Sequence, residues 1–142
     1  MVVLLVAIVA AVAVPRLGNS GALTQAAWRD QVQAGLSTAR QLAQGHRRLV
    51  CVALSTGELR LSMAAANPAT TCAQAVPGPD GDARWAHDRQ GLAISQSPSG
   101  TLYFQPDGRI TSDGAGNTAA DWTITIAGVT TITLVGETGH VR

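Results

Sequence analysis

The N-terminal stretch constrains this chain most, because residues 1–14 are all apolar and are followed by Pro15 and Arg16. The stretch has no charged side chain, no polar side chain and no glycine. A helix that crosses a bilayer needs about 20 apolar residues, so this run covers only about two thirds of the hydrocarbon. It is too apolar for a water-exposed surface and too short to span a membrane.

Three interpretations compete for residues 1–16. The first is a secretory signal peptide, with Ala11-Val12-Ala13 resembling a cleavage site for signal peptidase, although no basic residue precedes the apolar run and Pro15 follows closely. The second is a buried core helix, which the length allows. The third is a membrane helix without its first residues. The sequence that follows favours the third interpretation.

Residues 22–44 contain no proline and have the apolar periodicity of an amphipathic helix. Ser20 could cap this helix, or the helix could continue from the N-terminal run with a kink at Pro15. Gly45 and the basic residues 46–48 are expected to mark its end. The side chains expected to pack on the rest of the domain fall on one side of the helix: Trp28, Val32, Leu36, Ala39 and Leu42.

Beyond residue 48 the pattern becomes that of β-strands. Residues 49–54 and 58–63 predict a hairpin, and residues 64–91 predict a long loop with a short helical turn at 83–87. Further strands are predicted at 92–96, 101–105, 109–111, 122–127, 129–135 and 140–142. The expected fold class is therefore α+β, a long N-terminal helix packed on one antiparallel sheet. The expected organisation is a membrane or filament-core helix at 1–16, an amphipathic helix at 17–48 and a β head domain at 49–142.

Charge and cysteine content limit the possible functions. Ten basic and nine acidic residues give a net charge of +1, which favours neither nucleic acid nor an acidic partner. If the N-terminal segment directs the rest across a membrane, the compartment is oxidising, and Cys51 and Cys72 are expected to form a disulfide. Its closed loop of about 20 residues should contribute about 3 kcal/mol. The alternative is that both cysteines are free and buried.

Catalytic and metal-binding patterns are weak. His46, His87 and His140 do not have the spacing of a metal site, and no Gly-x-Ser-x-Gly nucleophile motif occurs. The acidic, glycine-rich segments at 80–82 and 113–117 lack the spacing of a calcium loop and are interpreted as turns. We therefore expect no enzyme activity, no cofactor and no metal.

Three arginines, Arg29, Arg40 and Arg47, fall on one flank of the predicted helix. They are interpreted as a solvated flank, and contact with neighbouring subunits is the alternative.

The run Val-Ala-Ile-Val-Ala-Ala-Val-Ala-Val-Pro-Arg at residues 6–16 resembles the N-terminal helix of the type IV pilin and pseudopilin superfamily. The segment Tyr-Phe-Gln-Pro-Asp-Gly-Arg at residues 103–109 resembles the Phe-x-x-x-Gly-Arg element of the type II secretion minor pseudopilin (GspH) and FimT-like minor pilins. The ending at residues 132–142 resembles the Glu-Thr-Gly-Tyr-Val ending of MSHA minor pilins of the MshC type, and the cysteine pair suits that subgroup.

The resemblance implies a pilin-type fold and a non-enzymatic filament subunit anchored in the bacterial inner membrane with its head in the periplasm. Its partners would be other pilins or pseudopilins, the inner membrane and the inner-membrane assembly platform. Some FimT-like proteins bind DNA through basic C-terminal residues, but Arg109, His140 and Arg142 form no basic cluster in the sequence, and DNA is not an expected partner. The helix residues expected to serve in the membrane and the filament are Val2, Leu4, Leu5, Ile8, Val12, Val14 and Pro15.

In that superfamily a short leader and several more apolar residues precede the part seen here. We therefore expect that the helix is longer in the natural protein, either because the start codon is assigned too late or because the chain is cut short. Restoring about seven apolar residues would give a full span. The alternative function is a secreted periplasmic binding module rich in β-structure that signal peptidase releases.

Overall fold

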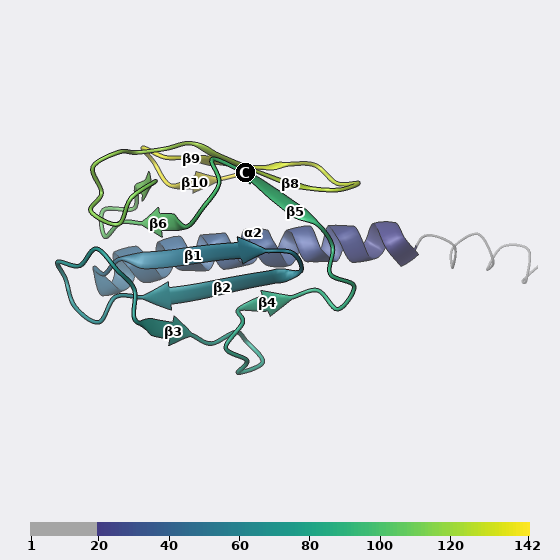
Figure 1. Cartoon of the computed structure of the whole chain (residues 1–142), viewed down its shortest axis with the longest axis horizontal. Helices are drawn as coiled ribbons and strands as arrows, with labels where there is room; N and C mark the ends of the chain where they lie inside the picture. Colours follow the sequence, from purple (N-terminus) through teal and green to yellow (C-terminus); the bar gives the residue numbers. More distant parts are fainter. Residues whose placement is uncertain (1–19) are drawn as a thin grey trace, which may run out of the picture.

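The computed structural model describes residues 20–142, which form one long helix followed by ten short strands (Figure 1). Helix α2 spans Ser20–His46. The strands are β1 Val50–Ser55, β2 Glu58–Met63, β3 Gln74–Val76, β4 Ala86–His87, β5 Ile94–Ser97, β6 Leu102–Phe104, β7 Ile110–Thr111, β8 Trp122–Ile126, β9 Ile132–Val135 and β10 His140–Val141. This order, one helix and then strands, is α+β in content.

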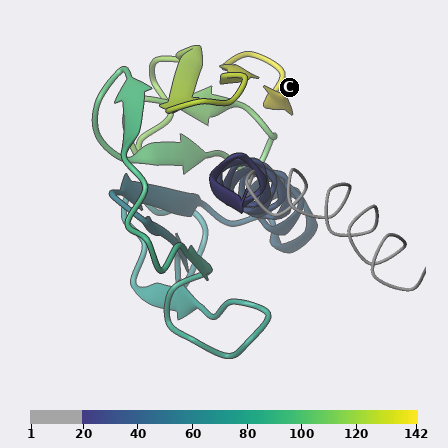
Figure 2. The same ribbon diagram turned by 90° about the vertical axis from the view of Figure 1, so that its right-hand side faces the viewer.

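The strands form two antiparallel sheets, and the expectation of a helix packed on a single sheet was wrong. The first sheet has the order β3-β2-β1-β6-β7, with β4 also paired to β2. The second sheet has the order β10-β9-β8-β5. Figure 2, which looks along α2, shows strands on two sides of the helix rather than one layer beneath it.

Alternation within the strands explains why both sheets share a core with α2. In β8 every second side chain, Trp122, Ile124 and Ile126, is buried, while the threonines between them face solvent. The inner residues of β1, β2 and β6 enter the same cluster from the first sheet. The sequence pattern shows which face of a strand is buried, but it does not show which strands pair. The segment 98–101 therefore joins strands of different sheets, β5 and β6, although local patterning could not distinguish it from a hairpin turn.

Helix α2 ends at His46, within the range 45–48 that was expected to mark its end. Gly45 is inside the helix, and the left-handed conformation that ends a helix is adopted by Arg47, with φ of 52°. The N–H of Arg48 donates to the carbonyl oxygen of Ala43 at 3.2 Å, which satisfies one of the last helical carbonyls. An arginine in this conformation is strained relative to glycine.

Segment 64–91 is more regular than the expected loop. It contributes β3 and β4, and both pair with β2. The helical turn expected at 83–87 is absent, because Ala86 and His87 form β4 instead. Tertiary pairing to Glu58 and Leu59 decides this conformation, and local propensity does not reveal it.

Helix α2 approaches the first sheet most closely at Gly35. A Cβ placed on Gly35 would touch Leu59 Cδ2 and would lie 2.9 Å from the indole nitrogen of Trp85. The absence of a side chain at this position therefore sets the distance between the helix and the sheet.

Candidate functional site

The two sides of α2 have different environments. Four of the side chains expected to pack on the domain, Trp28, Val32, Leu36 and Ala39, are at most 2% exposed. Leu42 is partly buried against the same core. Full burial of side chains of this kind contributes about 1.5–3 kcal/mol for each large residue, so this face holds the two sheets on the helix.

The N-terminal end of α2 extends past the sheets (Figure 1), and some of its apolar side chains are exposed. Leu23 is 68% exposed and is the only large hydrophobic residue exposed in the described part of the chain. The small residues Ala22, Ala26 and Ala27 are exposed near it. The apolar surface at this end therefore has no partner among residues 20–142.

Several predicted residues lie outside the part of the chain that the structure describes. They are the membrane and filament positions Val2, Leu4, Leu5, Ile8, Val12, Val14 and Pro15. Among residues 20–142, no helix combines the length and the apolar character that a bilayer crossing requires.

The basic flank of α2 faces the second sheet. Arg29 Nε donates to the carbonyl oxygen of Thr130 at 2.8 Å, and Arg29 Nη1 donates to Gln33 Oε1 at 2.9 Å. Arg29 therefore ties the β8–β9 turn to the helix, a contact within the subunit. Arg40 Nε is buried without a hydrogen-bond partner among the described residues, and Arg47 is exposed.

The predicted disulfide between Cys51 and Cys72 is confirmed, with 6.0 Å between the Cα atoms. It joins β1 to the segment after β2 and packs with Leu49, Ala64 and Tyr103 in a small cluster separate from the main core. Beside it lies an open hollow of about 400 Å³. Its lining includes Cys51, Ala53, Arg60, Ser62, Thr101 and Tyr103.

The structure brings together two sequence elements that lie about 30 residues apart, the turns at 106–109 and 136–139. A Cβ on Gly139 would touch the carbonyl oxygen of Gly108, and the N–H of Ile110 donates to Gly136 O at 2.7 Å. Both Gly108 and Gly139 have positive φ, 92° and 65°. Glycine is needed at these positions because of both the conformation and the close approach.

Arg109, one of three basic residues for which DNA contact was weighed and not expected, lies near carboxylates. Its Nε donates to Asp107 Oδ2 at 2.8 Å, and this hydrogen bond, with the charges of Asp107 and Glu137, raises the pKa of Arg109. A guanidinium neutralised in this way is poorly suited to a phosphate backbone.

Gln105 and Thr111 form a buried polar contact that the sequence did not suggest. Gln105 Nε2 donates to Thr111 Oγ1 at 2.8 Å, and Thr111 Oγ1 donates to the carbonyl oxygen of Asp113 at 2.7 Å. The Asp113 carboxylate in turn accepts from the N–H groups of Asn117 and Thr118, and these bonds lower its pKa. The only signal in the sequence was a glutamine inside an apolar strand pattern.

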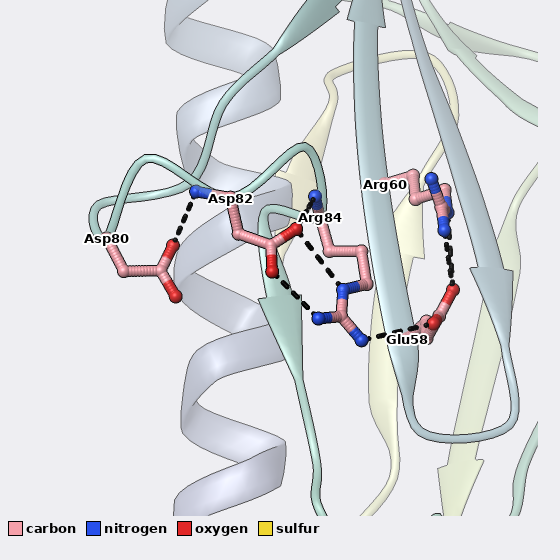
Figure 3. Close-up of polar contacts among 5 residues, drawn as sticks. All are labelled: Glu58, Arg60, Asp80, Asp82 and Arg84. Carbon is pink, nitrogen blue, oxygen red and sulfur yellow. Dashed lines mark hydrogen bonds and ion pairs between the residues drawn. The ribbon is translucent and has the colours of Figure 1, made fainter.

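A network of charged side chains joins β2 to the loop before β4 (Figure 3). Arg84 donates through Nη2 to Asp82 Oδ2 at 2.7 Å and through Nη1 to Glu58 Oε1 at 3.4 Å. The hydrogen bonds from the Arg84 side chain and from its backbone N–H hold the pKa of Asp82 far below its usual range. Glu58 also pairs with Arg60 at 3.1 Å.

The same loop places three groups with metal-ligand chemistry close to one another. One ligand atom each from Asp80, Asp82 and His87 lies within 4.8 Å of the others. His87 is held on β4 opposite Glu58, whereas the two aspartates come from the loop that precedes it. The sequence spacing alone did not predict this cluster.

Comparison of the chain with models of known protein families, with curated proteins and with solved structures finds no match in any of the three. The resemblance to pilins therefore remains a prediction from the sequence motifs.

Proposed function

We propose that the protein is a non-enzymatic structural subunit, a minor pilin or pseudopilin of a type IV filament of the MSHA kind or of a type II secretion filament. The observation that carries the proposal is the exposed apolar end of α2, where Leu23 is 68% exposed. In the sequence this end follows the apolar run at residues 1–14 after the segment 15–19. Leu23 and the exposed alanines Ala22, Ala26 and Ala27 group apolar side chains at one end of the helix, and grouped exposed apolar side chains are a feature of interaction sites.

The composition of this surface suits contact between helices. Ala22, Ala26 and Ala27 have small side chains, and small residues allow helix backbones to approach closely when helices pack in an apolar environment. The partners are then the helices of other subunits and the inner membrane, with the assembly platform as the machinery that extracts the subunit. The head would lie in the periplasm, which agrees with the disulfide.

The proposal rests on the helix and its sequence and not on the fold of the head. The two sheets differ from the single antiparallel sheet that the strand pattern predicted. What the head contributes is a rigid support, because its core fixes the part of α2 from Trp28 onward and leaves the first turns uncovered.

Photo-crosslinking in cells that assemble the filament tests this function. A photoreactive amino acid at Leu23 should give crosslinks to another filament subunit, whereas the same amino acid at Thr125, an exposed position on β8, should not. A Leu23→Lys variant should fold as the parent does but enter sheared filaments less often, and Thr125→Lys is its matched control. Absence of crosslinks at Leu23, together with unchanged assembly of Leu23→Lys, would contradict the proposal.

The second candidate is a periplasmic binding module. The observation in its favour is the hollow of about 400 Å³ beside the disulfide, where the aromatic ring of Tyr103 and the guanidinium of Arg60 lie together. Cell fractionation separates the two functions. A protein found wholly in the soluble periplasmic fraction supports the binding module, whereas recovery with the inner membrane and the filament supports the subunit.

A further inference from the structure

We propose that Asp80, Asp82 and His87 form a binding site for a divalent transition-metal cation, with Zn²⁺ as the best-fitting metal. The site is independent of the filament function and lies on the side of the head formed by β4 and the loop before it. Neither the spacing of the histidines nor the acidic segment predicted it, because His87 reaches the aspartates only through the pairing of β4 with β2.

The geometry is close to that of a bound ion. The three ligand atoms lie within 4.8 Å of one another, and ligand atoms at the corners of a zinc tetrahedron are separated by about 3.3 Å. Asp82 and His87 are partly buried, whereas Asp80 is exposed and accepts one hydrogen bond among the described residues, so rotation of the Asp80 side chain can close this difference. No movement of the backbone is required.

The backbone already holds the loop in place. The N–H of Gly78 donates to the carbonyl oxygen of Asp82 at 2.9 Å, and the N–H of Gly81 donates back to Gly78 O at 2.9 Å. The N–H of Asp82 donates to Asp80 Oδ1 at 3.1 Å, and Figure 3 shows the Asp80 carboxylate beside the backbone of Asp82, whose own carboxylate points toward Arg84. The loss of loop entropy on metal binding is therefore small.

Each ligand retains a free coordination position. Asp80 has one oxygen without a partner among the hydrogen bonds of residues 20–142, and the ring of His87 makes no side-chain hydrogen bond within that range. The Asp82 carboxylate accepts three hydrogen bonds from Arg84: from the backbone N–H and Nε at Oδ1, and from Nη2 at Oδ2. A carboxylate has about four lone-pair positions, so Asp82 can still bind a metal through one oxygen.

Arg84 then has the role of a positioning residue. A carboxylate that ligates a metal is usually held by an outer hydrogen-bond partner, which fixes its orientation. The charges of Glu58, Asp80 and Asp82 sum to −3, and those of Arg60 and Arg84 to +2, so the network drawn in Figure 3 retains −1 and favours a cation.

The donor set selects the class of metal. One imidazole nitrogen with two carboxylate oxygens suits Zn²⁺ and its neighbours in the first transition row, whereas Mg²⁺ and Ca²⁺ prefer oxygen ligands alone. Asp80 and His87 also line a hollow of about 350 Å³ between this loop and α2. The hollow leaves room for water at the fourth position, the arrangement of a zinc site with three protein ligands.

Isothermal titration of the full chain with ZnCl₂ tests the site. The protein is used without an affinity tag, after treatment with a chelator, and in a mild detergent because of its apolar N-terminal run. We expect saturable binding of one Zn²⁺ per chain. His87→Gln and Asp80→Asn should each weaken binding by about tenfold or more, since even outer partners of a metal contribute about that factor. His140→Gln, at an exposed histidine on β10, should bind as the parent does.

Binding of Co²⁺ provides a second measurement, which is spectroscopic and does not rely on the heat of binding. Co²⁺ bound by nitrogen and oxygen ligands in a tetrahedral site has visible absorption bands, which should appear with the parent and the His140→Gln variant and be lost with His87→Gln. Asp80 lies on an exposed turn, so the far-ultraviolet circular dichroism of the Asp80→Asn variant should match that of the parent and show that the variant is folded. No saturable binding at millimolar Zn²⁺, or equal affinity of the parent and His87→Gln, would overturn the proposal. Either result would leave the filament function untouched.

Discussion

Replacement of Gly35 by alanine should destabilise the protein, whereas the same replacement at Gly45 should stabilise it. Both glycines lie in α2, so the change in backbone entropy is similar. Their surroundings differ: a Cβ on Gly35 would touch Leu59 and lie 2.9 Å from Trp85 Nε1, whereas a Cβ on Gly45 would meet nothing within 4 Å. The pair therefore separates helix propensity from packing.

The expected magnitudes follow from these contacts. Gly45→Ala should raise the free energy of unfolding by about 0.5–1 kcal/mol, the difference in helix propensity. Gly35→Ala gains the same amount but also overpacks the interface, which costs about 1–3 kcal/mol. Leu59 is fully buried, so moving it aside would disturb its neighbours in the core. The two variants should therefore differ by about 1–3 kcal/mol.

Urea unfolding followed by tryptophan fluorescence measures this difference, with the full chain in the same mild detergent for every variant. Equal m values would show that the variants expose the same surface on unfolding, so that a shift in midpoint reports stability. For a domain of this size, each kcal/mol corresponds to about 4 °C in Tm. In a Leu59→Val background, where the contacting methyl group is withdrawn, the loss caused by Gly35→Ala should shrink.

The result that would refute this reasoning is a shift of the same sign and size for both alanine variants. It would mean that α2 does not approach the first sheet at Gly35 as closely as the structure has it. A loss at Gly35 that stays unchanged in the Leu59→Val background would assign the effect to Trp85 instead.

Two further predictions concern the loops. In the double variant Cys51→Ala/Cys72→Ala the free energy of unfolding should fall by about 3 kcal/mol, because the disulfide closes a loop with a sequence separation of 21. Urea unfolding of the parent in reducing agent should show the same loss. An unfolding midpoint of the parent that does not change on reduction would contradict this prediction. For Asp113, whose folded pKa is lowered by the N–H of Asn117, the stabilisation is present above the unfolded pKa of about 3.9 and is lost as the pH falls through the folded value. The stability gap between the parent and Asp113→Asn, measured by thermal unfolding, should therefore be present at neutral pH and narrow below about pH 4. A difference in stability that does not change with pH would show that the ionised carboxylate of Asp113 is not its source.

Some features of the fold could be read from local patterns. The buried face of α2 follows from helical periodicity, because Trp28, Val32, Leu36 and Ala39 recur at the spacing that places side chains on one side of a helix. The hairpin of β1 and β2 follows from alternation and the turn at 55–57. These features depend on neighbours within a few residues, and the sequence alone contains that information.

Other features depend on contacts between distant residues. The division of the strands into two sheets could not be predicted, because a buried face has the same pattern whichever strand lies beside it. For the same reason the segment that forms β4 was expected to be a helical turn, and the pairing of residues 74–76 with β2 was not expected. Each of these was decided by tertiary pairing or packing.

By itself, the sequence determined that the chain has an apolar N-terminal run, an amphipathic helix and a set of half-buried strands, because periodicity and composition record which side chains avoid water. Only the tertiary structure decided which groups meet. It left Leu23 exposed at the end of α2, brought the turns around Gly108 and Gly139 into contact, and placed His87 beside Asp80 and Asp82. Proximity of this kind arises from the packing of whole elements, and the spacing of residues along the chain does not encode it.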